Sequence, residues 1–112
     1  AIPYWDYDAP VTKETPRDVS AAAVTASAMI ELSTMVPDGQ KYLDYAEKIL
    51  KNLSSDAYLA KVGDNQGFIL MHSVGSLPNG SEIDTPLNYA DYYYLEALKR
   101  FMDLKGINYK DI

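Results

Sequence analysis

The spacing of apolar and polar positions along the chain predicts three helices, over residues 19–36, 39–53 and 89–104. In the first of these, VSAAAVTASAMIELSTMV, the only charged residue is Glu31. The first helix therefore has no polar face, and a helix of this kind is expected to be covered by neighbours on all sides.

The other two predicted helices are amphipathic. The second carries apolar residues at helical spacing and charged residues on the other side, which is typical of an outer helix that packs by one face. The third has an apolar stripe made of Ala90, Tyr94, Ala97, Leu98 and Phe101. Possible helix starts are marked by capping residues and by proline, which suits the first helical position: Thr15-Pro16 with Asp18 in the first turn, Asp38, and Thr85-Pro86.

Two amphipathic helices cannot cover a third helix that is apolar all round. We therefore expect an all-α fold in which this chain is part of a larger antiparallel helical array, such as a helical barrel.

The connection over residues 54–87 is long for a compact fold. Part of it, GFILMHSVG, is compatible with a short strand, with PNG as its turn, so this connection has room for a short β-hairpin. It also contains His72, the only histidine of the chain.

Composition and charge exclude several classes of function. The net charge is −6, and the basic residues are scattered, so we expect no nucleic-acid partner. No apolar run approaches the roughly 20 residues that span a bilayer, so we expect no membrane partner. The absence of cysteine excludes disulfides, thiolate catalysis and cysteine-ligated zinc. No cofactor is expected, and the opening AIPYWDYD does not resemble a signal peptide.

Two aromatic side chains could contact a sugar. Trp5 offers a ring that could stack on a sugar face, although an anchor in the core is the favoured interpretation. His72 could donate to a sugar hydroxyl or act as a hydrogen-bonded structural residue. His72, Asp84 and Asp91 lack the spacing of metal ligands, so no metal site is expected.

Other candidate residues have a structural alternative that we favour. Asp6 and Asp8 could form a carboxylate pair, but a turn before Pro10 explains Asp8 equally well. Arg17 and Asp18 could pair at a barrel opening or serve as a helix cap. For the triplet Tyr92, Tyr93 and Tyr94, packing is the default interpretation.

Four segments, taken in order, carry a family resemblance: YWDYDAP, TPRDVSAAAVTASAMIELS, GQKYLDYAEKIL and YADYYYLEALKR. Together they resemble the C-terminal region of the unsaturated glucuronyl hydrolases, glycoside hydrolase family 88. The resemblance implies an (α/α)6 barrel, of which residues 1–112 would be the C-terminal part of a single domain. The partner implied within the protein is the missing N-terminal part of the same barrel.

The resemblance also implies a reaction, namely release of an unsaturated uronic acid from oligosaccharides that lyases produce from glycosaminoglycans. In the family an aspartate acts as general acid and base on the vinyl ether group of the sugar. The family's catalytic aspartates lie in its N-terminal half, so no catalytic residue is expected in this fragment, and the fragment alone is expected to be inactive. A bacterial source is implied, with periplasm and cytoplasm both open.

The same resemblance points to Ser73 and Ser76 as substrate-binding residues. The corresponding family loop has a pattern S-x-x-S-x-K, associated with recognition of a sulfate group. The sequence SVGSLP keeps both serines but has Pro78 where the lysine would be, and Val74 where some relatives place a tyrosine. The preferred glycosaminoglycan and its sulfation therefore stay open, and the serines are also ordinary turn formers.

Two other functions are alternatives. One is the related family of unsaturated rhamnogalacturonyl hydrolases, which shares the barrel; the segments WDYDAP and RDVSAAA argue against it. The other is a non-enzymatic helical interaction module, which would be a stable, cooperatively melting protein without further residues.

Overall fold

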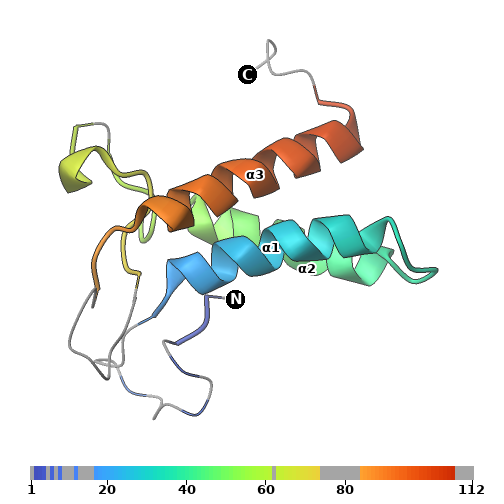
Figure 1. The fold of residues 1–112 in the computed structure, drawn as a ribbon, viewed down its shortest axis with the longest axis horizontal. Helices are drawn as coiled ribbons and strands as arrows, with labels where there is room; N and C mark the ends of the chain where they lie inside the picture. The colour runs from blue at the N-terminus through green and yellow to red at the C-terminus, as the bar shows by residue number, and fades with distance from the viewer. Residues whose placement is uncertain are drawn as a thin grey trace.

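The computed structural model describes residues 2–4, 6, 8, 12, 17–61, 63–73 and 84–107. Within this part of the chain lie three α-helices, α1 (Val19–Ser33), α2 (Gln40–Leu53) and α3 (Asn88–Lys105), and a short 3₁₀-helix, η1 (Asn65–Gly67). Figure 1 shows that α1 and α3 run in the same direction and that α2 runs back behind them. The segment before α1 and the connection between α2 and α3 therefore meet at one end of the helices.

Helix α1 begins at residue 19, as the apolar spacing predicts, and three residues after Pro16, which the Thr15-Pro16 pattern favours as the first helical residue. Its first residue is Val19, and Asp18 is the N-cap, with Oδ1 accepting a hydrogen bond from the Ser20 amide at 3.0 Å. The reason is that the chain before the helix is extended, since Arg17 pairs with Tyr4 in an antiparallel bridge. Thr15 and Pro16 themselves lie outside the described residues.

The predicted starts of the other two helices also differ from the observed ones. Gly39, without a side-chain cap, precedes α2, and Asp38 instead pairs with Lys41 at 2.8 Å. Leu87 precedes α3, because Thr85 is engaged in a bridge with Ser73. Helix α3 ends at Gly106, whose φ of 72° lies in the left-handed region that glycine adopts without strain.

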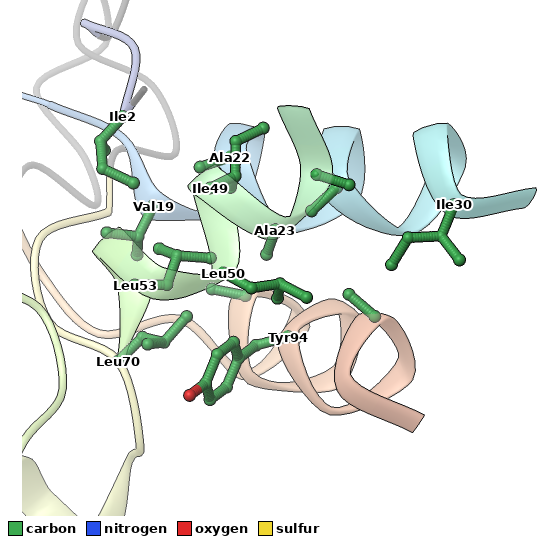
Figure 2. Packing of buried hydrophobic residues seen from close by; sticks show 14 of the residues in the cluster. Ile2, Val19, Ala22, Ala23, Ile30, Ile49, Leu50, Leu53, Leu70 and Tyr94 are labelled. Carbon is green, nitrogen blue, oxygen red and sulfur yellow. The ribbon is translucent and has the colours of Figure 1, made fainter. Parts of the chain in front are cut away.

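Small side chains on α1 allow the other helices to come close. Ala22, Ala23 and Ala26 are at most 1% exposed, and they face larger residues from the neighbouring helices. Figure 2 shows Ile49, Leu50 and Leu53 of α2 and Tyr94 of α3 packed against this side of α1, with Ile2 and Leu70 closing one end. Burying each of the larger side chains contributes about 1.5–3 kcal/mol.

The sequence predicts that α1 needs more neighbours than α2 and α3 alone, and apolar side chains of α1 that remain exposed agree with this prediction. Val24 and Leu32 are 40% and 37% exposed, so α2 and α3 leave one side of α1 uncovered in this chain. Among the described residues, no helix is long and apolar enough to cross a membrane.

Within residues 54–61, 63–73 and 84–87, the connection between α2 and α3 pairs with itself through isolated bridges. Leu59 pairs with Leu70, and Ser73 pairs with Thr85, both in antiparallel fashion. The described residues contain no β-strand, so the strand expected over GFILMHSVG is reduced to these single pairs. The PNG turn expected for a hairpin lies outside the described residues.

Gly39 marks the tight turn between α1 and α2, and its substitution by alanine gives a test of the packing. A Cβ atom at this position would lie 1.9 Å from the carbonyl oxygen of Ser33, so the two helices would have to separate. We expect Gly39→Ala to lower the free energy of unfolding of the full-length protein by about 1–3 kcal/mol, measured by urea denaturation. Lys48→Ala, at an exposed position of α2, is the control and should change it by less than about 0.5 kcal/mol. Equal stability of the two variants would contradict the close approach at Gly39.

Candidate functional site

Two of the predicted substrate-binding residues, His72 and Ser73, lie in the connection where it passes the start of α1. The Val19 amide, the first of α1, donates to the His72 carbonyl oxygen at 3.0 Å. Ser73 exchanges two backbone hydrogen bonds with Thr85, each 3.0 Å long. The site is therefore anchored both to the N-terminus of α1 and to the residues that lead into α3.

The His72 side chain is held at the surface by an acidic partner. Its Nδ1 lies 2.5 Å from Oδ1 of Asp84, and 44% of the side chain is exposed. Tyr58 meets the imidazole edge to face, with ring centroids 6.0 Å apart. Because Nδ1 is engaged by Asp84, Nε2 is the ring nitrogen available to bond a ligand.

The backbone at His72 and Asp84 adopts an uncommon conformation. His72 has a φ of 71° and Asp84 a φ of 48°, both in the left-handed region that side chains other than glycine seldom adopt. Such a conformation persists only where surrounding contacts enforce it. The backbone contacts around His72 therefore help to set the geometry of the site.

Ser73 is fully buried, which differs from the exposed loop hydroxyl that a turn former would have. Its Oγ has no hydrogen-bond partner in the described part of the chain. A buried hydroxyl without a partner costs roughly 1–3 kcal/mol. Because of this cost, we expect Ser73 Oγ to form a hydrogen bond with a group from outside the described residues.

The other two predicted binding residues, Trp5 and Ser76, lie outside the described residues. Their assignment stays a prediction.

The structure resolves the alternatives at the N-terminal end in favour of local structural roles. Oδ1 of Asp6 accepts a hydrogen bond from the Asp8 amide at 2.8 Å, so the turn-forming carboxylate belongs to Asp6 and not to Asp8. Arg17 binds the carbonyl oxygen of Ile2 at 2.6 Å and lies over the ring of Tyr4 at 4.4 Å. The cap interpretation of Asp18 is confirmed.

Asp91 has a role that the sequence did not reveal. It stands in the first turn of α3, and its two carboxylate oxygens accept hydrogen bonds from the amides of Ile69 and Leu70, at 2.9 and 3.0 Å. The carboxylate of Asp91 is thus turned toward backbone amides. In the described ranges no three potential metal ligands gather into a cluster.

A second polar cluster joins α1 to α3 farther along the helices. The Ser27 hydroxyl donates to Oε1 of Glu96 at 2.5 Å, and Arg100 donates to the Ser27 carbonyl oxygen at 3.1 Å. Arg100 also pairs with Glu96 at 3.5 Å and with Glu31 at 3.3 Å. The hydrogen bond from the Ser27 hydroxyl is the main reason that the pKa of Glu96 lies below its usual value; burial opposes it, and the charge of Arg100 and a hydrogen bond from Tyr92 add smaller lowering effects.

A cleft of about 400 Å³ adjoins this cluster and is lined by Ile30, Glu31, Thr34, Arg100, Asp103 and Leu104. It lies toward the C-terminal ends of α1 and α3, whereas His72 is bonded to the first residue of α1, at the other end of these helices. The cleft is therefore separate from His72 and Ser73, the predicted binding residues that the structure describes.

The comparisons with known proteins agree on one family. No family model matches the chain. An unsaturated glucuronyl hydrolase from Formosa agariphila is 50% identical over 103 residues, which cover 92% of this chain and 26% of that protein. A crystal structure of an unsaturated glucuronyl hydrolase specific for heparin is 67% identical, with a TM-score of 0.92, over 95% of this chain and 29% of that one. A variant of the Streptococcus agalactiae unsaturated glucuronyl hydrolase, complexed with dGlcA-GalNAc6S, is 31% identical, with a TM-score of 0.81, over 89% of this chain and 27% of that one.

The predicted resemblance to the unsaturated glucuronyl hydrolases of glycoside hydrolase family 88 is confirmed. The chain spans about a quarter of the length of the curated relatives it matches, which are bacterial. The fold class is confirmed as well, because α1, α2 and α3 form part of an α/α barrel.

Glu96 gives a pH-dependent test of the polar cluster. Because its pKa is lowered by folding, its contribution to stability is fully present above the unfolded value of about 4.5 and is lost as the pH falls through the lower folded value. We expect Glu96→Gln to lower the melting temperature of the full-length protein at neutral pH, and the difference from wild type to shrink below pH 4.5.

Glu47→Gln is the matched control for Glu96→Gln, since the pair of Glu47 with Lys51 is long, at 3.7 Å, and exposed. It should cost at most a few tenths of a kcal/mol, on the order of a surface ion pair. A difference between wild type and Glu96→Gln that stays constant into the acid range would contradict the assignment of the Ser27–Glu96–Arg100 cluster.

Proposed function

We propose that this chain is the C-terminal part of a single (α/α)6-barrel enzyme that releases unsaturated glucuronic acid from glycosaminoglycan oligosaccharides produced by lyases. The observation that carries the proposal is the match to a solved unsaturated glucuronyl hydrolase, at 67% identity and a TM-score of 0.92 over 95% of this chain.

The exposed apolar side chains of the helices support the assignment to a larger barrel. Met35 at the end of α1 is 68% exposed, and Tyr92 and Leu95 of α3 are 62% and 52% exposed. Tyr92 and Leu95 are three positions apart on α3 and so form a contiguous apolar face, and such a face is normally an interaction surface. We infer that the remaining helices of the barrel cover them, which also disfavours a free-standing helical module.

The proposed reaction is hydration of the vinyl ether of the unsaturated sugar. A carboxylic acid protonates the double bond, the same group as carboxylate helps water to add, and the resulting hemiketal opens so that the glycosidic bond breaks. We place this acid outside the present chain. In support, Asp18, Asp91 and Glu96 are each engaged by hydrogen bonds that serve the fold.

We propose that His72, Ser73, Ser76 and Trp5 lie on the substrate side of the site. His72 is exposed at the end of the helices, with Nδ1 held by Asp84. Ser73 presents a buried hydroxyl that lacks a partner among the described residues. A sugar hydroxyl or sulfate oxygen can bond Nε2 of the exposed His72, whereas Ser73, at 0% exposure, needs a partner that reaches it inside the protein.

The substrate class that we propose is the set of unsaturated disaccharides derived from heparin. The solved relative at 67% identity is described as specific for heparin. Pro78 stands at the position where the S-x-x-S-x-K pattern has a lysine, so a cation that would favour sulfate is missing from this position. The sulfate dependence is therefore expected to be weak at the sugar beyond the scissile bond.

Hydrolysis of defined disaccharides by the full-length protein tests the proposal. We expect the ultraviolet absorbance of the double bond to fall with unsaturated glucuronyl disaccharides, with the highest kcat/KM on those from heparin. Sulfated and unsulfated forms should be hydrolysed with similar kcat/KM. An unsaturated galacturonyl disaccharide from rhamnogalacturonan is the control substrate and should be stable, and hydrolysis of that substrate alone would overturn the proposal.

A further inference from the structure

We propose that Asp91 is a positioning residue for substrate binding: its carboxylate holds the backbone of residues 69–73, called the 69–73 segment below, and thereby holds His72 and Ser73 in place. This inference rests on the proposed function, because it assigns to Asp91 a part in binding the same substrate.

The geometry of Asp91 is that of a two-point clamp. Oδ2 accepts from the Ile69 amide at 2.9 Å, and Oδ1 accepts from the Leu70 amide at 3.0 Å. Hydrogen bonds to an ionised carboxylate are about twice as strong as neutral ones. Two of them on consecutive amides fix both the place and the orientation of the backbone.

The other contacts of the 69–73 segment come from neighbouring loops and from the first residue of α1, whose Val19 amide donates to the His72 carbonyl oxygen at 3.0 Å. Asn65 Nδ2 donates to the Leu70 carbonyl oxygen at 2.9 Å, and the Met71 amide donates to the Tyr58 carbonyl oxygen at 2.8 Å. Among the contacts of the described residues, Asp91 is the side chain that ties the segment to an α-helix. A helix is a more rigid support than a loop, so Asp91 sets the position of Ile69 and Leu70 relative to α3, while the Val19 amide holds the other end of the segment at α1.

The clamp binds a part of the segment that is closed to water, so no water molecule can replace Asp91 as the hydrogen-bond acceptor. Leu70 is fully buried, with 0% exposure. If the carboxylate were removed, its amide would lose its acceptor with little access to solvent, and the backbone would have to shift to find another.

A shift at Leu70 would reach the predicted binding residues two and three positions later. His72 has a φ of 71°, which depends on the contacts around it. Release of the segment would let His72 return to a negative φ, and this rotation would carry its ring away from Asp84. Ser73 would move with it, because the two residues share a peptide plane.

Asp91 acts through other residues and does not itself contact the substrate. Both of its oxygens are occupied by backbone amides. The expected signature of its loss is weaker substrate binding with little change in the chemical step.

The test is steady-state kinetics of the full-length protein carrying Asp91→Asn, on the best unsaturated glucuronyl disaccharide. Asparagine supplies one acceptor oxygen, and its NH₂ group would face an amide donor, so one charge-assisted hydrogen bond is lost. We expect KM to rise about tenfold or more, as the loss of one such bond implies, while kcat stays within about twofold.

Asp103→Asn is the matched control, since it makes the same change on the same helix at an exposed position. Its KM and kcat should equal those of the wild type. Asp91→Glu is the second variant and decides the matter if Asp91→Asn does not fold. Its carboxylate is displaced by one methylene, so the clamp is kept but shifted, and KM should rise several-fold.

The possible outcomes separate the two proposals. Wild-type KM in a folded Asp91→Asn or, failing that, Asp91→Glu protein overturns the positioning role and leaves the proposed function standing. A fall in kcat with unchanged KM would also overturn it, because that result indicates a role in the chemical step or a smaller folded fraction. A wild-type protein that hydrolyses no unsaturated glucuronyl substrate overturns both.

Discussion

The close approach of α2 and α3 to α1 is the constraint on which the other features of this chain depend. Ala22, Ala23 and Ala26 present little more than a methyl group each, so the backbones of the neighbouring helices can come near, and larger side chains such as Leu53 fill the space between them. Interiors are packed at crystal-like density, which leaves little freedom for the helix ends. The connections that leave those ends therefore start from well-defined points.

Polar side chains on the helices fix the position of the connections by hydrogen-bonding to their backbone. Asp18 caps α1 and directs the chain before it, while Asp91 reaches from α3 to the amides of Ile69 and Leu70. The amide of Val19 completes the arrangement by binding His72. The irregular segment around His72 thus acquires a definite conformation from the N-terminal ends of α1 and α3. Groups at a helix end are not used within the helix and are free to form such hydrogen bonds.

The sequence predicted the ranges of the helices well and their capping residues poorly. The apolar spacing in α2 placed Leu43, Ala46 and Ile49 in the core correctly, because a half-buried helix leaves a strong periodic signal. The Thr-Pro pairs misplaced the caps of two helices, because bridges made by Arg17 and Thr85 with distant residues keep the chain extended. Such long-range pairing is not visible in a local pattern.

The candidate site was predicted in part for a similar reason. The resemblance singled out His72 and Ser73, but the left-handed backbone at His72 and the clamp from Asp91 depend on contacts between residues about twenty positions apart. Nothing in the spacing of acidic residues distinguishes Asp91 from the other carboxylates of the chain. Trp5 and Ser76, which lie outside the described residues, stay predictions.

The contact of Ser27 with Glu96 and Arg100 has a consequence for how α1 and α3 can align. Ser27 is 1% exposed, and its hydroxyl both donates to Glu96 and accepts from Arg100. Sliding α3 by one turn, about 5.4 Å, would take both partners away and leave this hydroxyl unsatisfied in the interior. The pair of helices α1 and α3 therefore has a single favoured register. Since Asp91 lies little more than one turn before Glu96 on α3, that register also sets the height at which the 69–73 segment docks above the start of α1.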